Sequence, residues 1–136
     1  MSFESAEDLD RKKKAARIFV NIFGGSFSAL SVSDSDFKIF DSKKKLISYA
    51  DVVLVDGSYD RSSNLIVSVS RISKLSQKRL NPVVIWLFND GIVYAKLNNI
   101  SGKISWGNLP GKESNPFTDE LIAEFSQDKN FKYERG

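Results

Sequence analysis

The side chains available for chemistry in this 136-residue chain are carboxylates, lysines and hydroxyls, because the sequence contains no cysteine and no histidine. Their absence excludes disulfide frameworks, Cys/His zinc sites, thiol nucleophiles and triads that use an imidazole base. Asp51 is a candidate site residue, because it is a carboxylate at the start of an apolar, β-branched run at residues 51–55. The alternative is an aspartate that hydrogen-bonds a turn where a strand begins.

Two hydroxyls form a second candidate group. Ser68 and Ser70 interrupt the apolar run at residues 65–70, where strand preference favours valine or threonine. A pocket that holds polar groups would explain them. The alternative is a pair of buried hydroxyls that hydrogen-bond each other or the backbone.

Basic residues gather at residues 11–17, 43–45 and 71–79, although the net charge is only +3. Such a distribution can meet a polyanion, and solvated helix faces are the alternative. The candidate nucleic-acid contacts are Lys12, Lys13, Lys14, Arg71, Lys74, Lys78 and Arg79. The aromatic candidates to stack on single-stranded nucleic acid are Trp86, Trp106, Tyr49, Tyr59 and Tyr94. Trp106 lies beside a loop and is the better candidate for exposure, whereas Trp86 lies in an apolar run and is expected in the core.

Hydrophobic periodicity and turn residues predict the elements that must position these side chains. Helices are expected at residues 5–23, 71–80 and 119–126. One strand is expected at 27–32, where a turn interrupts it before it resumes at 37–40, and further strands are expected at 51–55, 65–70, 83–88 and 92–97, with another short strand at 102–107. Gly24-Gly25 ends the first helix, and Asp90-Gly91 predicts a hairpin between the strands that flank it. The polar tail after Lys129 is expected to fray.

These elements predict an α/β (α+β) fold, a three-layer-like sandwich in which helices flank a mixed β-sheet in the order α-β-β-β-α-β-β-α. One domain is expected over residues 1–136. Residues 51–55 and 65–70 are expected as neighbouring strands, which would turn Asp51 toward Ser68 and Ser70.

The order of elements and three segments resemble the PD-(D/E)xK, or restriction-endonuclease-like, nuclease superfamily. The segments are YADVVLVDG at 49–57, LIVSVSRI at 65–72 and NPVVIW at 81–86. In that family a helix precedes a three-stranded meander, and a helix and a further strand follow. The second strand carries a metal-binding aspartate, and the third carries Glu or Asp, one apolar residue and then Lys. The resemblance implies that Asp51 stands in the metal-ligand place, with Ser68 and Ser70 in the places of the carboxylate and the lysine. It also implies a core at about 5–97 and a C-terminal extension at 98–136.

The two serines imply that catalysis has been lost. Mg²⁺ is a hard ion that prefers carboxylate oxygens and water as ligands. A serine hydroxyl supplies neither that charge nor the cation that offsets charge in the transition state. The first hypothesis is therefore a nuclease-like domain without catalysis, which acts as a nucleic-acid-associated or accessory protein.

Two alternatives stay open. One is a divergent Mg²⁺-dependent nuclease that uses Asp51, a carboxylate from elsewhere, and Lys74 or Lys78 in place of the lysine. The candidate carboxylates are Glu4, Glu7, Asp34, Asp36 and Asp56, because no Asp or Glu occurs between Asp60 and Asp90. The other alternative is an α/β protein-interaction module with no nucleic-acid role.

No cofactor is expected, except Mg²⁺ in the active-nuclease alternative. DNA or RNA is the expected partner, and a homo-oligomer or a protein partner stays open. The first residues contain no apolar h-region, and the longest apolar run, residues 82–88, is far shorter than the ~20 residues that a membrane span requires. We therefore expect no membrane partner and a cytoplasmic location.

Overall fold

The computed structural model describes residues 6–29, 37–107 and 120–136, which form two helices and nine strands in two sheets. Sheet A is six-stranded, with the order β1-β2-β3-β5-β6-β9. Its strands are β1 (Ser26–Ala29), β2 (Phe37–Phe40), β3 (Leu46–Leu54), β5 (Val83–Leu87), β6 (Gly91–Lys96) and β9 (Lys132–Arg135). Sheet B is antiparallel and has the order β4-β8-β7, built from β4 (Leu65–Ser68), β8 (Glu120–Phe125) and β7 (Lys103–Gly107).

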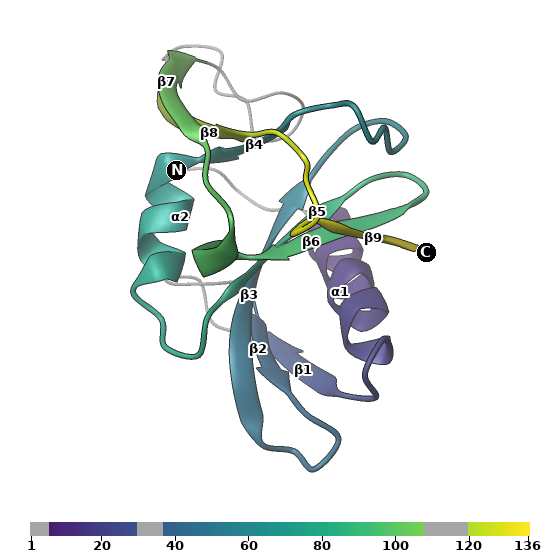
Figure 1. Cartoon of the computed structure of the whole chain (residues 1–136). Helices are drawn as coiled ribbons and strands as arrows, with labels where there is room; N and C mark the ends of the chain where they lie inside the picture. The colour runs from purple at the N-terminus through teal and green to yellow at the C-terminus, as the bar shows by residue number, and fades with distance from the viewer. Residues whose placement is uncertain (1–5, 30–36, 108–119) are drawn as a thin grey trace.

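The two helices lie on opposite faces of sheet A (Figure 1). α1 (Ala6–Asn21) packs on one face, and α2 (Val69–Ser76) lies on the other side together with sheet B. β3 and β5 are parallel, so the chain crosses from one to the other through β4 and α2. The predicted α/β class, with helices flanking a mixed sheet, is confirmed.

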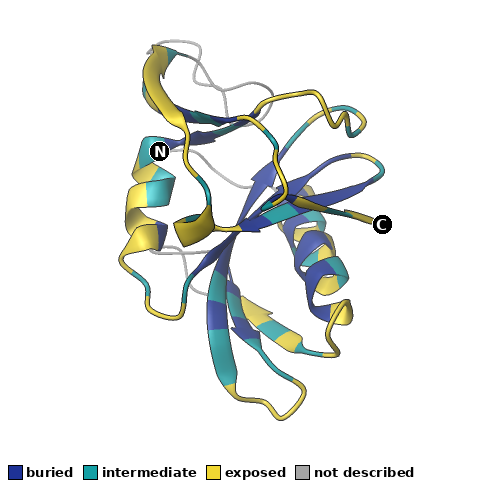
Figure 2. Ribbon diagram, viewed as in Figure 1, coloured by how far each residue is buried: buried dark blue, intermediate teal, exposed yellow. Residues whose placement is uncertain are grey.

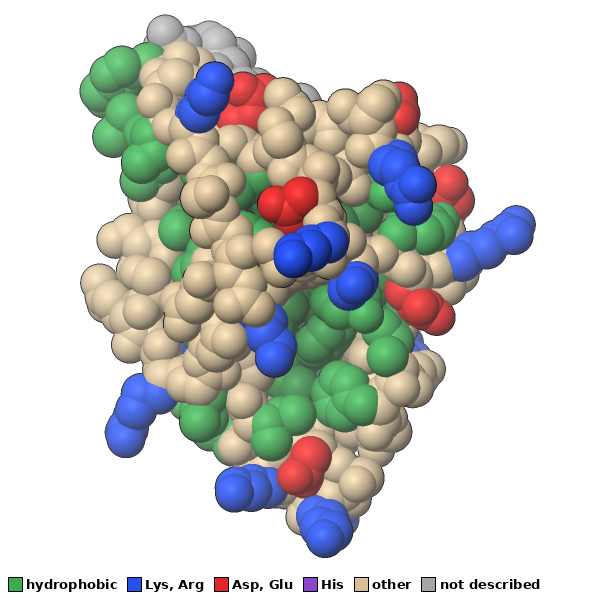
Figure 3. All heavy atoms as spheres, in the orientation of Figure 1, with side chains coloured by type: hydrophobic (Ala, Val, Ile, Leu, Met, Phe, Trp, Pro, Cys, Tyr) green, Lys and Arg blue, Asp and Glu red, His purple; other side chains and the backbone are tan. Residues whose placement is uncertain are grey.

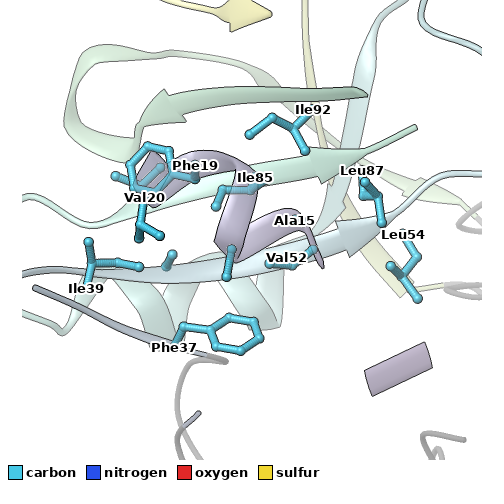
Figure 4. Packing of buried hydrophobic residues seen from close by; sticks show 13 residues of the cluster. Ala15, Phe19, Val20, Phe37, Ile39, Val52, Leu54, Ile85, Leu87 and Ile92 are labelled. Atoms are coloured by element: carbon cyan, nitrogen blue, oxygen red, sulfur yellow. The ribbon is translucent and has the colours of Figure 1, made fainter. Parts of the chain in front are cut away.

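The C-terminal half of β3 and the whole of β5 are buried on both faces (Figure 2). Val52 and Ile85 point toward α1 and belong to the hydrophobic cluster drawn in Figure 4. Val53 and Trp86 belong to a second cluster on the other side of the sheet, which includes residues of α2 and sheet B. Because successive side chains alternate along a strand, Asp51 lies on the same side as Val53.

The end of α1 and the hairpin between β5 and β6 lie where the sequence predicts them. Gly24 follows α1 with a φ of 74°, a left-handed conformation that glycine adopts without a Cβ clash. Asn89 and Asp90 form the turn between β5 and the antiparallel β6, which begins at Gly91, and the backbone N–H of Phe88 donates to the Gly91 carbonyl at 2.8 Å. The predicted helix start at Ser5, the end of the first strand at 30–32 and the turn at 34–36 fall outside the described residues.

The prediction that residues 51–55 and 65–70 form neighbouring strands is wrong. Both edges of β3 are occupied, one by β2 and the other by β5. β4 pairs instead with β8, with Leu65 opposite Phe125. Ser68 therefore lies in sheet B and Ser70 lies in α2, whereas Asp51 lies in sheet A.

α2 spans Val69–Ser76, so it begins and ends earlier than the predicted range of 71–80. It begins early because the Ser68 side chain caps it and accepts a hydrogen bond from the backbone N–H of Arg71 at 3.3 Å. Ser70 consequently lies in the helix and not in a strand. Leu75 is buried as expected, whereas Leu80 has a positive φ and is 48% exposed instead of facing inward.

The predicted helix at residues 119–126 is wrong, because Glu120–Phe125 form strand β8. Leu, Ala and Glu favour a helix in isolation. β8, however, is the middle strand of sheet B and pairs with both β4 and β7. Ala123 and Phe125 also enter the cluster around Trp86. Pairing on two edges and burial override the local preference.

The prediction that the tail after Lys129 frays is also wrong. β9 pairs with β6, with Val93 opposite Tyr133. Phe131 is buried, with its ring centroid 6.0 Å from that of Trp86, and Tyr133 stacks on Tyr59 at 4.1 Å. These aromatic contacts fix the tail, so residues after 97 contribute strands to both sheets.

Candidate functional site

Asp51 is a buried carboxylate held by an arginine. It lies on β3, only 6% exposed, on the side of sheet A that faces α2. Arg71 donates from Nε to Oδ2 of Asp51 at 2.9 Å and from Nη2 to Oδ1 at 2.7 Å. The same Nη2 donates to the Val52 carbonyl at 2.6 Å. This two-pronged geometry is the strongest form of a guanidinium–carboxylate contact.

The two serines form a capping group at the start of α2. Their hydroxyl oxygens are 2.7 Å apart, and Ser68 also accepts from the backbone N–H of Arg71. Ser68 is 4% exposed, whereas Ser70 is exposed. The structure therefore brings Asp51, Ser68, Ser70 and Arg71 into one hydrogen-bonded group. Arg71 forms the link between Asp51 and the serines, whereas the sequence predicted that paired strands would bring them together.

The surroundings of Asp51 do not fit a divalent cation. A guanidinium occupies both carboxylate oxygens where a metal ion would need them. The described ranges contain no group of three or more Asp, Glu, His or Cys that could hold a metal. Glu7 lies on α1, against the opposite face of sheet A, and Asp56 is exposed beyond the end of β3. Glu4, Asp34 and Asp36 fall outside the described residues.

The basic residues that follow Arg71 are accessible on the α2 side. Lys74 and Arg79 are exposed, and Lys78 is half-buried with Nζ 5.2 Å from the centroid of the Tyr49 ring. Such a contact is a cation–π interaction that leaves the ammonium at the surface. No acidic residue occurs between Asp60 and Asp90, so this segment carries no negative charge of its own.

The basic residues of α1 lie on the other side of sheet A and differ in accessibility. Lys12 is 6% exposed and is buried in the helix interface together with Asp8. Lys13 is half-buried, whereas Lys14 and Arg17 are exposed. The seven candidate contacts therefore do not share one surface. On the face drawn in Figure 3, Lys and Arg side chains stand apart from one another, with Asp and Glu between some of them.

The aromatic candidates separate into core and surface residues. Trp86 is fully buried, as predicted, and its Nε1 donates to the Ile66 carbonyl of β4 at 3.1 Å. Tyr94 packs edge-on against Phe19, and burial raises the pKa of its phenol. Trp106 is 70% exposed on β7 and is the most exposed aromatic side chain among the described residues.

The loop between β3 and β4 lies over a cavity of about 230 Å³. Its lining is mixed, with Val53, Trp86 and Phe88 among the apolar residues and Asp56 and Asn64 among the polar ones. In the same loop, the Asp60 carboxylate accepts hydrogen bonds from the backbone N–H and the hydroxyl of Ser62. These two bonds lower the pKa of Asp60, since they stabilise its ionised form.

Sequence reasoning missed the role of Arg71, which was expected to contact nucleic acid and instead neutralises Asp51. One feature could have revealed it. Asp51 stands inside an apolar strand, and a buried carboxylate requires a partner. Arg71 follows the apolar run at residues 65–70 and lies in a segment without acidic residues. Only the path of the chain from β3 through β4 and α2 to β5 shows that its side chain reaches Asp51.

None of the described helices combines the length and the apolar composition that crossing a membrane requires. Comparison with known proteins gives no further constraint. The chain matches no family model, and no curated protein or solved structure is significantly similar to it.

Proposed function

We propose that this chain is a restriction-endonuclease-like domain that has lost catalysis and acts as a nucleic-acid-associated or accessory protein. The observation that carries the proposal is the internal ion pair between Asp51 and Arg71. It supplies a protein cation at the carboxylate that would otherwise bind a metal ion, next to a segment whose remaining basic residues are accessible.

The order of elements supports this kinship. α1 precedes the antiparallel meander β1-β2-β3, and α2 then leads to β5, which is parallel to β3. In this order Asp51 stands on the third strand of the meander and not on the second. The family's Glu or Asp, apolar residue and Lys would then correspond to Asp51, Val52 and Val53, so valine replaces the lysine.

The loss of catalysis follows from charge. Val53 is 3% exposed and apolar, so it cannot orient water or offset negative charge as a lysine does. Arg71 holds Asp51 from the α2 side and forms two hydrogen bonds that a metal ion would have to displace. A metal ion that displaced Arg71 from Asp51 would leave the guanidinium without its counter-charge, and this cost opposes displacement.

Binding to nucleic acid is assigned to α2 and the residues that follow it, because residues 61–89, which carry these cations, contain no acidic residue. Lys74 and Arg79 are exposed, and Lys78 lies over Tyr49. α1, by contrast, carries Glu7, Asp8 and Asp10 among its basic residues. Contacts of lysine and arginine with phosphates release counterions, so affinity must fall as salt rises.

Fluorescence anisotropy with labelled duplex DNA, single-stranded DNA and single-stranded RNA tests this assignment over a range of salt concentrations. We expect Lys74→Glu/Arg79→Glu to weaken binding at least ~10-fold and to reduce the salt slope by about two, one per lost phosphate contact. Lys14→Glu/Arg17→Glu makes the same charge change with exposed residues of α1 and should leave binding close to wild type. Equal losses in both variants, or no binding at low salt, would contradict the proposal.

Cleavage assays test the loss of catalysis separately. Plasmid and oligonucleotide substrates with Mg²⁺ or Mn²⁺ should remain intact in the presence of the wild-type chain. Metal-dependent cleavage that disappears in Asp51→Ala would instead establish the active-nuclease alternative and overturn this part of the proposal.

A further inference from the structure

The outer edge of β7 is the most apolar exposed feature of the described residues. Ile104 is 64% exposed and Trp106 is 70% exposed, the highest values among the large hydrophobic side chains. Both point to the same face of sheet B as Leu121, which lies directly opposite Trp106 and is 38% exposed. Figure 3 shows hydrophobic side chains gathered at the upper left, where Figure 1 places β7.

β7 also ends a sheet. It pairs with β8 on one side, and no strand of the described ranges pairs with its other side. The outward N–H and C=O groups of such an edge form a template for a further strand. Edges are commonly protected by proline, bulges or several charges, whereas Lys103–Gly107 contains one lysine and no proline.

We propose that β7 pairs with β7 of a second copy of this chain, antiparallel and centred on Ser105. This register places Ile104 opposite Trp106 of the second copy, and Trp106 opposite its Ile104. Aromatic and β-branched residues opposite each other are favourable cross-strand pairs. Two-fold symmetry makes the contact isologous, so it closes as a dimer and leaves no free β7 edge.

The charges in sheet B fit the same register. Lys103 lies opposite Glu124 of its own β8, and Gly107 lies opposite Glu120. In the dimer, Lys103 of one copy lies opposite Gly107 of the other, which has no side chain. The lysine can therefore extend across Gly107 toward Glu120, which lies on the same face of the sheet. The register brings no like charges together and pairs a cation with an acid twice.

The apolar side chains become continuous across the two-fold axis. Leu121 and Trp106 of one copy form a row with Ile104 and Ala123 of the other, and the symmetry repeats that row. The combined sheet has six strands in the order β4-β8-β7-β7-β8-β4. A five-residue edge buries less surface than a standard interface, so the expected affinity lies in the micromolar to millimolar range.

Analytical ultracentrifugation of the full chain, from about 1 µM to about 1 mM, tests the dimer. Wild type should convert from monomer to dimer as concentration rises. Ile104→Glu and Trp106→Lys should each raise the dissociation constant at least ~10-fold, a loss of about 1.4 kcal/mol. Ile22→Glu is the matched control, because Ile22 is also exposed, at 44%, but lies at the end of α1.

The double variant Ile104→Glu/Trp106→Lys tests the register. In the proposed pairing, each new glutamate lies opposite a new lysine, so the double variant should dimerise more tightly than either single variant, and high salt should remove the gain. Nonspecific apolar association predicts the reverse order. A wild-type chain that stays monomeric at about 1 mM, single variants that dimerise like wild type, or a double variant weaker than both single variants would overturn the proposal.

Discussion

Arg71 holds both carboxylate oxygens of Asp51, with Nε 2.9 Å from Oδ2 and Nη2 2.7 Å from Oδ1. The two residues come from different layers, since Asp51 lies on β3 of sheet A and Arg71 lies in the first turn of α2. The pair therefore ties the crossover helix to the sheet at Asp51, the residue that the resemblance to nucleases assigns as a metal ligand.

Breaking this pair from one side should destabilise the fold. Arg71→Met leaves the Asp51 carboxylate buried without its guanidinium, and we expect unfolding free energy to fall by about 2–4 kcal/mol, at or below the range for fully buried pairs. The double variant Asp51→Leu/Arg71→Met should be more stable than Arg71→Met, because no charge stays buried. Urea denaturation measures both. Arg79→Met is the control, an exposed arginine whose loss should cost less than about 0.5 kcal/mol.

The two tryptophans should differ sharply in their access to solvent. Trp86 is fully buried and Trp106 is 70% exposed. In dilute samples, Trp106→Phe should leave a blue-shifted emission that acrylamide quenches weakly, and Trp86→Phe should leave a red-shifted emission that acrylamide quenches several-fold more strongly. Trp86→Phe also removes the hydrogen bond to the Ile66 carbonyl and should cost about 1–3 kcal/mol. Equal quenching of both variants would contradict the assigned burial.

The C-terminal tail should contribute substantially to stability. Phe131 packs between Trp86 and Phe125, with ring centroids 6.0 Å and 6.2 Å away. Phe131→Ala should lower the unfolding free energy by about 3 kcal/mol, the low end of the range for truncating a buried phenylalanine. Lys129→Ala, at an exposed position of the same tail, should change it by less than about 0.5 kcal/mol. A frayed tail predicts no difference between the two variants in thermal or urea denaturation.

Asp60 should titrate below the usual pH range of an aspartate. The backbone and hydroxyl hydrogen bonds from Ser62 lower its pKa, so the folded state favours the ionised carboxylate. The resulting stabilisation is present above the unfolded pKa and is lost as pH falls through the folded pKa. Carbon-13 NMR of the Asp60 carboxyl should show its pKa rising toward the ordinary value in Ser62→Ala. Ser58→Ala is the control and should leave that pKa unchanged.

Local patterns predicted the parts of the fold that depend on local interactions. The apolar stripe of α1 ends at a glycine pair, and Asp90-Gly91 joins two β-rich runs, so the helix and the hairpin follow from residues close in sequence. The burial of Trp86 followed from its place in a continuous apolar run.

Long-range pairing decided what local patterns could not. Residues 120–125 combine residues that favour a helix with apolar positions that fit the period of either a helix or a strand. They form a strand because they pair with β4 on one side and with β7 on the other. Likewise, residues 51–54 and 65–68 lie in strands as predicted, although β3 begins earlier and β4 ends earlier than expected, and the parallel partner of β3 is β5. Asp51 could be singled out from its place in an apolar strand, whereas its partner Arg71 could be found only from the path of the chain between β3 and β5.

The position of β8 in the middle of sheet B has a consequence for synthesis on the ribosome. β4 emerges early, but its backbone partner β8 is made only after β5, β6 and β7. A nascent chain can therefore assemble α1 with the β1-β2-β3 meander while β4 still exposes an unpaired edge. The pairing of β4 in sheet B therefore has to wait until Glu120–Phe125 leave the exit tunnel.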